Sequence, residues 1–336
     1  MAAAESPWVL ELSSGTFRCG FAAQDLVSGF FRLPCESAPY EAQLAGHGRQ
    51  VSTPGALVAA LDWAAEATGA GEPAQITVVV PSGCELRQMR EMARELFESG
   101  RAEKLLLIHA ASAHAVGAGV GSAVVVDAGR SGTDISFASP HAVVTKTSRT
   151  ELDWSGDQLT SRVRERLEAK IGSPVAEATA ASVKEAFASL AGGDPAAATP
   201  FVLPDGTELA PDTWASEVGS VADLSWAAVA PAAADAVARA LEAEGDAMAK
   251  EHPVVLLTGA ASRLPGLATR IAADVATRIG REVRVVRSAT AEKNGFLGGF
   301  FLSATSMYGS KLAMSKDRYE EEGIRHIMLG TGGRVV

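Results

Sequence analysis

The sequence has few cysteines, no long apolar run and no surplus of basic residues. No run of about 18 apolar residues occurs, so we expect no transmembrane helix. The start, MAAAESP, lacks a basic segment and an apolar core, so we expect no signal peptide. The three cysteines, Cys19, Cys35 and Cys84, are scattered, which indicates reduced thiols in the cytosol or nucleus. A net charge of −10 argues against direct binding of nucleic acid.

The stretch from Ala123 to Phe137, AVVVDAGRSGTDISF, has the composition of a strand, a turn and a second strand. Asp127 follows the apolar run, and Gly129 and Gly132 lie in the turn. Backbone N–H groups gathered at such a turn bind phosphate, and a neighbouring carboxylate holds a hydrated cation. Taken alone, the same residues fit an ordinary hairpin equally well.

A second stretch, WVLELSSGTFRCGFA from Trp8 to Ala22, has the same layout. An apolar strand leads to Glu11, small residues form a turn at 13–15, and Arg18 begins the return strand. A chain of 336 residues with 47% hydrophobic content is long enough for two lobes. Two such hairpins therefore predict one phosphate loop in each lobe, with a nucleotide in the cleft between them.

Two Ser-x-x-Glu/Gln patterns predict helix starts. Ser82 with Glu85, and Ser155 with Gln158, have the spacing of a capping box, in which the two side chains bond the free backbone N–H groups reciprocally. Each pattern is followed by apolar residues at helical spacing, so we expect a helix after each.

Glycine-rich runs occur at 117–121 and at Gly298-Gly299. A dinucleotide-binding fingerprint follows a strand and opens a helix, whereas the run at 117–121 precedes a strand, so we interpret it as a turn. We expect Gly298-Gly299 to open the last long helix.

The order and spacing of several segments resemble the actin family from Trp8 to about Gly323. They read ELSSGTFRCGFA, VVDAGRSGT, LDWSGDQLT, VKEAF, LPDGTEL, LLTGAASRLPG, FLGGFFLSA and MSKDRYEEEG. The resemblance implies an α/β, actin-like ATPase fold with two lobes, each a mixed sheet flanked by helices. Residues 1–110 plus 297–336 would form a small lobe with its outer part truncated. Residues 111–296 would form a large lobe, with an outer subdomain at about 156–250.

The resemblance also implies ATP or ADP with Mg2+ in the cleft. Glu11 and Asp127 would hold the cation, although Glu11 is one methylene longer than the family's aspartate. Ala260 replaces a family glycine, and its methyl group would crowd the nucleotide. The nucleotide-binding positions are Ser13, Ser14, Gly15, Arg18, Asp127, Gly129, Arg130, Ser131, Gly132, Lys184, Glu185, Gly259, Ala260 and Lys293.

Three departures from the family concern hydrolysis. His109 stands near the position of a glutamine, Asp134 at that of a histidine, and Arg130 at that of an acidic residue. Positioning the attacking water is most of what a protein contributes to phosphoryl transfer, so we expect slow hydrolysis or none and assign no catalytic residue. For His109 we favour a helix-end residue with no catalytic role. Arg130 is a candidate partner for phosphate oxygens.

Between the first hairpin and a helix expected from Pro54, the chain is much shorter than in actin. The missing part includes the loop that inserts into the next filament subunit, and a contact that does not repeat ends a filament. The resemblance therefore implies a non-polymerising structural subunit that binds other actin-like and non-actin subunits and no membrane. We expect a cytoplasmic, cytoskeletal filament cap of the dynactin pointed-end type. The alternatives are a nuclear chromatin-remodelling subunit, and an ATP-hydrolysing or phosphoryl-transferring enzyme on the same fold.

Overall fold

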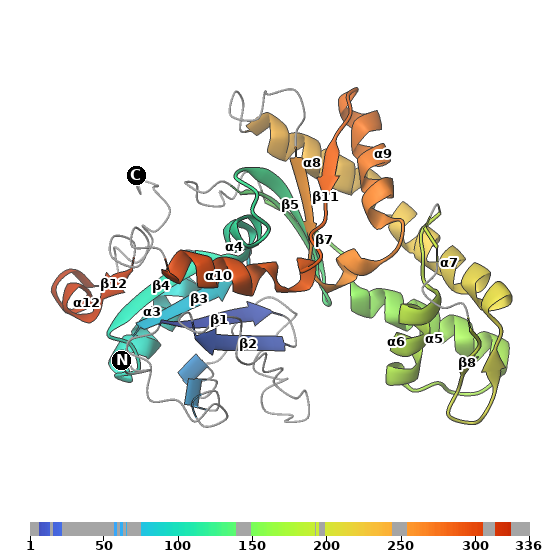
Figure 1. The fold of residues 1–336 in the computed structure, drawn as a ribbon, viewed down its shortest axis with the longest axis horizontal. Helices are drawn as coiled ribbons and strands as arrows, with labels where there is room; N and C mark the ends of the chain where they lie inside the picture. The colour runs from blue at the N-terminus through green and yellow to red at the C-terminus, as the bar shows by residue number, and fades with distance from the viewer. Residues whose placement is uncertain are drawn as a thin grey trace. The chain divides into compact units, whose positions relative to one another are not determined.

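The computed structural model describes residues 7–13, 16–21, 57–58, 61–62, 65, 75–138, 149–191, 193–194, 199–243, 254–304 and 313–323. The chain forms two compact units (Figure 1). Unit 1 comprises Met1–Ala123, Phe137–Lys146 and Lys293–Val336, and unit 2 comprises Val124–Ser136 and Thr147–Glu292. Each unit has a five-stranded mixed sheet flanked by helices, which confirms the expected α/β class.

The sheet of unit 1 has the order β12-β4-β3-β1-β2. Its strands are β1 (Trp8–Ser13), β2 (Thr16–Phe21), β3 (Gln75–Val80), β4 (Lys104–His109) and β12 (Met314–Ser315). Strands β1, β3 and β4 run parallel, and β2 and β12 are antiparallel to their neighbours. The first predicted hairpin is therefore confirmed. Because β1 lies between two partners, its apolar residues are buried on both faces of the sheet.

Helices cover both faces of this sheet. They are α3 (Leu86–Glu98), α4 (Ala110–Gly117), α10 (Asn294–Ala304) and the short α12 (Lys316–Glu322). Successive residues of β3 point to opposite faces of the sheet, and each face is covered by different helices. On one face, Val78 packs in an apolar cluster with Met89 of α3. Val79 packs in another with Ala113 of α4 and Leu302 of α10.

Helices α4 and α10 pack closely, as Figure 1 shows. A Cβ atom on Gly298 would lie 1.8 Å from the carbonyl oxygen of Ala113, and one on Gly117 would lie 2.0 Å from that of Asn294. The prediction that Gly298-Gly299 opens the last helix is wrong. The helix begins at Asn294, and these glycines lie inside it because α4 leaves no room for a side chain.

The sheet of unit 2 has the order β11-β10-β5-β6-β7. Its strands are β5 (Ala123–Ala128), β6 (Thr133–Ala138), β7 (Thr150–Leu152), β10 (Val254–Thr258) and β11 (Arg284–Val286). Strands β5, β10 and β11 are parallel. Strands β5 and β6 are neighbours joined only by residues 129–132, so the second predicted hairpin is also confirmed. In both units, the antiparallel hairpin (β1–β2 or β5–β6) lies next to a parallel strand (β3 or β10).

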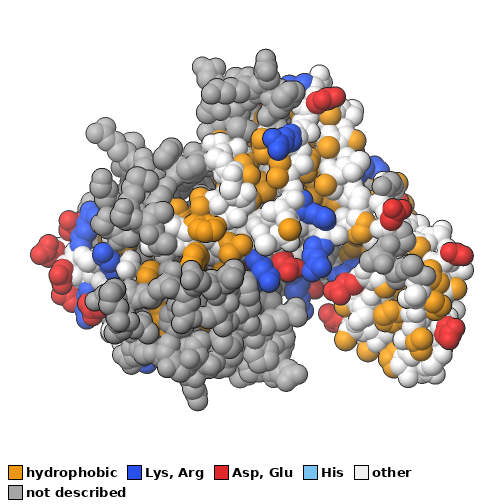
Figure 2. Space-filling model, in the orientation of Figure 1, with side chains coloured by type: hydrophobic (Ala, Val, Ile, Leu, Met, Phe, Trp, Pro, Cys, Tyr) orange, Lys and Arg blue, Asp and Glu red, His pale blue; other side chains and the backbone are white. Residues whose placement is uncertain are grey.

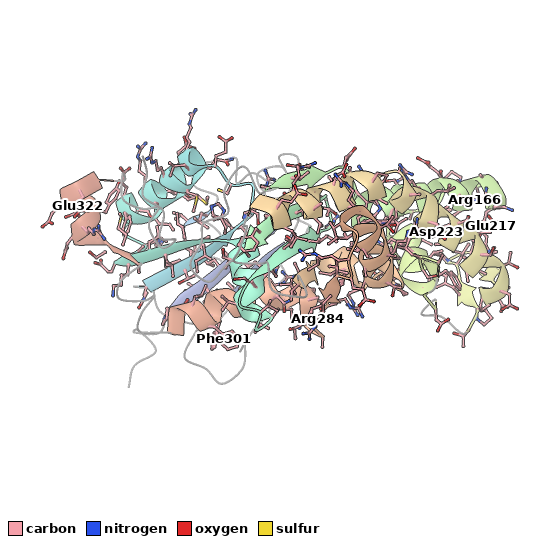
Figure 3. All side chains as sticks on the ribbon, turned by 90° about the horizontal axis from the view of Figure 1, so that it is seen from above. Arg166, Glu217, Asp223, Arg284, Phe301 and Glu322 are labelled. Carbon is pink, nitrogen blue, oxygen red and sulfur yellow. The ribbon has the colours of Figure 1, made fainter. Side chains whose placement is uncertain are left out.

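The helices of unit 2 form two groups. Helix α8 (Ala230–Ala243) packs on α9 (Leu267–Ile279), and α5 (Gly156–Ile171) packs on both α6 (Glu177–Phe187) and α7 (Pro211–Ala227). Arg166 of α5 and Glu217 of α7 lie together in Figure 3, where Arg166 Nε donates to Glu217 Oε2 at 2.7 Å. A small hairpin, β8 (Phe201–Val202) and β9 (Glu208–Leu209), precedes α7.

One of the two predicted capping serines is confirmed. Ser155 Oγ accepts from the backbone N–H of Gln158 at 3.1 Å and caps α5. The prediction for Ser82 is wrong, because α3 begins at Leu86 and Glu85 is its cap residue, with Gln88 completing the box. Ser82 Oγ instead accepts from the backbone N–H of Ala111 at 3.1 Å and joins the start of α4 to the segment after β3.

Two loops of unit 2 interlock through glycines. A Cβ atom on Gly193 would lie 2.5 Å from the backbone of Pro265 and Gly266. One on Gly266, at φ +84°, would lie 2.7 Å from the carbonyl oxygen of Leu190. The backbone N–H of Leu190 donates to Pro265 O at 2.8 Å. The segment after α6 is therefore held against the segment that starts α9.

The drawn face of the molecule in Figure 2 carries side chains of both charge signs, with apolar side chains between them. In the described part of the chain, no single helix has both the length and the apolar composition needed to cross a membrane. The bent pair Pro211–Ala227 and Ala230–Glu242 reaches that length and composition only when the two helices are taken together.

Candidate functional site

The hairpin of unit 1 places Glu11 and Arg18 opposite one another on β1 and β2. Arg18 Nη1 donates to Glu11 Oε2 at 2.7 Å, and the two side chains are only 19% and 5% exposed. Ser13 ends β1, whereas Ser14 and Gly15 lie outside the described residues. The predicted phosphate cradle at 13–15 therefore stays a prediction, while its flanking acid and base form an internal ion pair.

The start of α10 leaves space for the Glu11 carboxylate. A Cβ atom on Gly295 would lie 2.4 Å from Glu11 Oε1 and 3.1 Å from Cε1 of His114, which α4 contributes. Both Glu11 and His114 are buried. The extra methylene of Glu11 thus carries its carboxylate into a site bounded by Arg18, His114 and the first turn of α10.

These contacts show whether the Glu11 carboxylate can act as a magnesium ligand. Mg2+ needs near-octahedral oxygen ligands and usually takes one or two carboxylates, substrate phosphates and several waters. The carboxylate of Glu11 already bonds Arg18 and is enclosed, so it does not fit a hydrated cation in this arrangement. Within the described ranges, no group of three or more His, Cys, Asp or Glu side chains is placed to hold a metal. The cation role of Asp127 stays a prediction.

In unit 2, the turn between β5 and β6 is closed by its glycines. Gly129 N–H donates to Gly132 O at 2.8 Å. A Cβ atom on Gly129 would lie 2.9 Å from that oxygen, so a side chain there would force the turn apart. Ser131 is exposed at the tip. The turn therefore has the tight backbone that a phosphate loop requires.

The first turn of α5 is bonded directly to this turn. The backbone N–H groups of Gly156 and Asp157 donate to the carbonyl oxygens of Gly129 and Arg130 at 3.1 and 2.8 Å. The side chains of Arg130 and Asp157 also pair, with Nε 3.0 Å from Oδ1. Asp157 was not among the predicted site residues. The available signal was an acidic residue in the first turn of a capped helix, together with an arginine in the glycine turn.

Lys184 joins α6 to the same helix start. Its Nζ donates to the Gly156 carbonyl oxygen at 3.2 Å and to Thr160 Oγ1 at 2.8 Å. Burial lowers the pKa of Lys184, an effect that Glu185 and Asp157 oppose and Arg130 reinforces. Glu185 is exposed beside it. Lys184, a predicted nucleotide-binding residue, is thus connected to the turn at 129–132 through the start of α5.

The turn after β10 lies against the end of β5. Thr258 pairs with Asp127 in the sheet, and Gly259 follows at φ +86°. A Cβ atom on Gly259 would lie 2.4 Å from Ala128 O and 2.5 Å from Asp127 Oδ1, so only glycine fits there. Ala260 is exposed and begins a 3-10 turn, η4 (Ala260–Arg263).

The structure therefore brings one set of predicted residues together within unit 2. Asp127, Gly129, Gly132 and Gly259 lie at the carboxyl ends of β5 and β10, where open α/β sheets bind ligands. Lys293 ends the 3-10 turn η5 (Ala291–Lys293) and is assigned to unit 1.

The positions implicated in hydrolysis have other contacts. Arg149, the residue before β7, binds Asp134 of β6, with Nη2 2.7 Å and Nε 2.9 Å from Oδ1. His109 is 6% exposed at the end of β4 and is the residue before α4. Its side chain makes no capping bond to that helix.

Residues 173–330 match the family model described as Actin. A search of curated proteins returned no match. The matched region includes α6 with Lys184, the turn at Gly259 and helix α10. The match covers less than half of the chain, and together with the two mixed sheets flanked by helices it is consistent with an actin-like fold.

Proposed function

We propose that this chain is a non-polymerising actin-related protein that acts as a structural subunit of a multiprotein cytoskeletal assembly in the cytoplasm. Its partners would be other actin-like subunits and non-actin subunits. Within that class we propose a filament-ending role of the dynactin pointed-end type. A nucleotide, ATP or ADP, would serve as a static ligand.

The Asp134–Arg149 ion pair carries this proposal. The resemblance implies a histidine at Asp134 that helps to order the attacking water. A carboxylate bound by two nitrogens of Arg149 and 7% exposed is held in the sheet instead. Catalysis of phosphoryl transfer depends on positioning that water, so a fixed anion at this place favours a site that holds nucleotide without turning it over.

The residues of unit 2 support nucleotide binding. The tight turn at 129–132 would meet the phosphates, with Arg130 as the charged partner. Lys184, Glu185 and the turn at Gly259 would lie on the base side. A ligand that binds only the folded state stabilises it by mass action, so a nucleotide that is never hydrolysed would act as a brace.

The filament-ending role rests on the sequence. The chain between residues 22 and 53 is too short for the loop that reaches the next subunit in actin. A subunit that lacks one side of a head-to-tail contact terminates a polymer.

Two measurements on the purified full chain test the proposal. Denatured protein run on an ion-exchange column should release stoichiometric ATP, and mixing the protein with radiolabelled ATP should give no turnover above the buffer rate. Mostly ADP, or multiple turnovers, would instead support the enzyme class. Ultracentrifugation under actin-polymerising salt should leave the protein in the supernatant, and regular sedimentable filaments would refute the filament-ending role.

A further inference from the structure

We infer that Asp157 competes with the nucleotide for Arg130, so that phosphate must displace an internal carboxylate to gain its arginine partner. This inference rests on the nucleotide binding proposed above. Asp157 contacts Arg130 twice, through its side chain at 3.0 Å and through its backbone N–H, which donates to Arg130 O at 2.8 Å. The second contact keeps the carboxylate beside the turn when the first one opens.

The exposure of this ion pair distinguishes it from the pair in unit 1. The side chains of Arg130 and Asp157 are 41% and 45% exposed, whereas Glu11 beneath Arg18 is 5% exposed. Exposed pairs contribute little and exchange readily with solvent and ions, whereas breaking a buried pair leaves an uncompensated charge. A phosphate can therefore displace Asp157 from Arg130, whereas the buried Glu11 is expected to stay bonded to Arg18.

The start of α5 gives an anion few other donors. The N–H groups of Gly156 and Asp157 are used by the carbonyl oxygens of the turn, and that of Gln158 is used by Ser155 Oγ. An approaching phosphate therefore finds the guanidinium of Arg130 rather than the helix amides. A guanidinium can bind two phosphate oxygens in a fork, and Arg130 bonds Asp157 Oδ1 through Nε.

Lys184 places a second cation beside the residue that precedes Asp157, because its Nζ donates to Gly156 O at 3.2 Å. Burial lowers the pKa of Lys184, Asp157 opposes that shift and Arg130 reinforces it. Asp157 therefore pairs with Arg130 while a second cation lies near it in the unliganded protein. A phosphate that binds Arg130 displaces the Asp157 carboxylate into the solvent, and the phosphate then provides the negative charge opposite Arg130.

The test measures ATP and pyrophosphate binding by titration calorimetry to the full-length protein stripped of nucleotide. Asp157→Asn should bind both ligands about two- to five-fold more tightly than the wild type, the range expected when an exposed competing ion pair is removed. Glu165→Gln is the matched control. Glu165 is an exposed acid on the same helix with no ion pair among the described residues, and its removal changes the net charge equally.

A double variant separates displacement from general electrostatics. Arg130→Ala should weaken binding more in the Asp157→Asn background than in the wild type, because the wild-type arginine is partly occupied. Unchanged or weaker binding by folded Asp157→Asn, or equal gains in Glu165→Gln, would overturn the inference while leaving nucleotide binding in place. Absence of binding in both wild type and Asp157→Asn would overturn both. Binding by Asp157→Asn alone would support the competition and refute the static nucleotide.

Discussion

Gly295→Ala tests whether the start of α10 is shaped around the carboxylate of Glu11. The added Cβ would lie 2.4 Å from Glu11 Oε1, whereas ordinary contacts begin at 3.4 Å, so the oxygen must retreat by about 1 Å. His114 lies 3.1 Å from the same point. The same carboxylate contacts Arg18 through Oε2 at 2.7 Å, so moving Oε1 disturbs that ion pair.

The free energy of unfolding should fall by about 1–2 kcal/mol. Overpacking a buried site costs about 1–3 kcal/mol, and replacing glycine in a helix returns about 0.5–1 kcal/mol. Loss of the Glu11–Arg18 contact adds to the cost because both charges stay largely buried. Shortening the acid should relieve the clash, so Gly295→Ala with Glu11→Asp should be less destabilised than the sum of the single variants, by about 0.5 kcal/mol or more.

Urea unfolding followed by far-ultraviolet circular dichroism measures these differences. Gly121→Ala is the control, because a Cβ atom there has open space within 4 Å. It should leave the unfolding midpoint unchanged. A Gly295→Ala protein as stable as the wild type, or strict additivity in the double variant, would refute the argument that Gly295 accommodates Glu11.

Three further results are expected. Burial raises the pKa of the Cys19 and Cys84 thiols from 9.0 to about 12, which lowers the fraction present as reactive thiolate about 1,000-fold. In a Cys35→Ser background, DTNB should therefore label the native protein far more slowly than the urea-unfolded protein. Burial depresses the pKa of Lys184 below its usual 10.5, so the folded protein loses this proton at a lower pH than the unfolded chain does. The free energy of unfolding of the wild type, relative to Lys184→Gln, should therefore increase between pH 7.5 and 10. A difference that stays flat over this range would contradict the argument. Gly193→Ala should destabilise by about 2 kcal/mol or more in urea, because a Cβ atom 2.5 Å from backbone cannot be accommodated by a rotamer change, and an effect as small as that of Gly121→Ala would contradict the interlocked loops.

Local patterns in the sequence were sufficient for the hairpins and for one helix cap. The apolar runs before Glu11 and Asp127 and the small-residue turns after them placed β1, β2, β5 and β6 to within a few residues. Ser155 was identified because a cap bond depends only on neighbours three residues away. Spacing did not identify the true cap of α3, because Glu85 with Gln88 lies outside the Ser-x-x-Glu/Gln pattern, whereas Ser82 fits it but binds the distant Ala111 instead.

Features that depend on distant residues were not predictable. Helix α7 was not predicted, because the small residues Gly219, Ala222 and Ser225 form much of its buried face and because its packing partners α5 and α6 come from elsewhere in the chain. The interior place of Gly298 in α10 follows from the approach of α4, about 180 residues earlier in the chain. The partners of Arg130 and Asp134 are side chains of other elements, so no local window contains them.

Both hairpin arginines, Arg18 and Arg130, pair with carboxylates of the protein itself, which bears on whether folding must wait for a ligand. Arg18 meets Glu11 and Arg130 meets Asp157, each within its own unit. Neither hairpin therefore has to wait for an external anion before its strands close. Under the proposed function, newly made chains would fold and join partner subunits first and acquire nucleotide later. The cellular nucleotide concentration would then set how many assembled subunits are loaded, rather than how many chains reach the folded state.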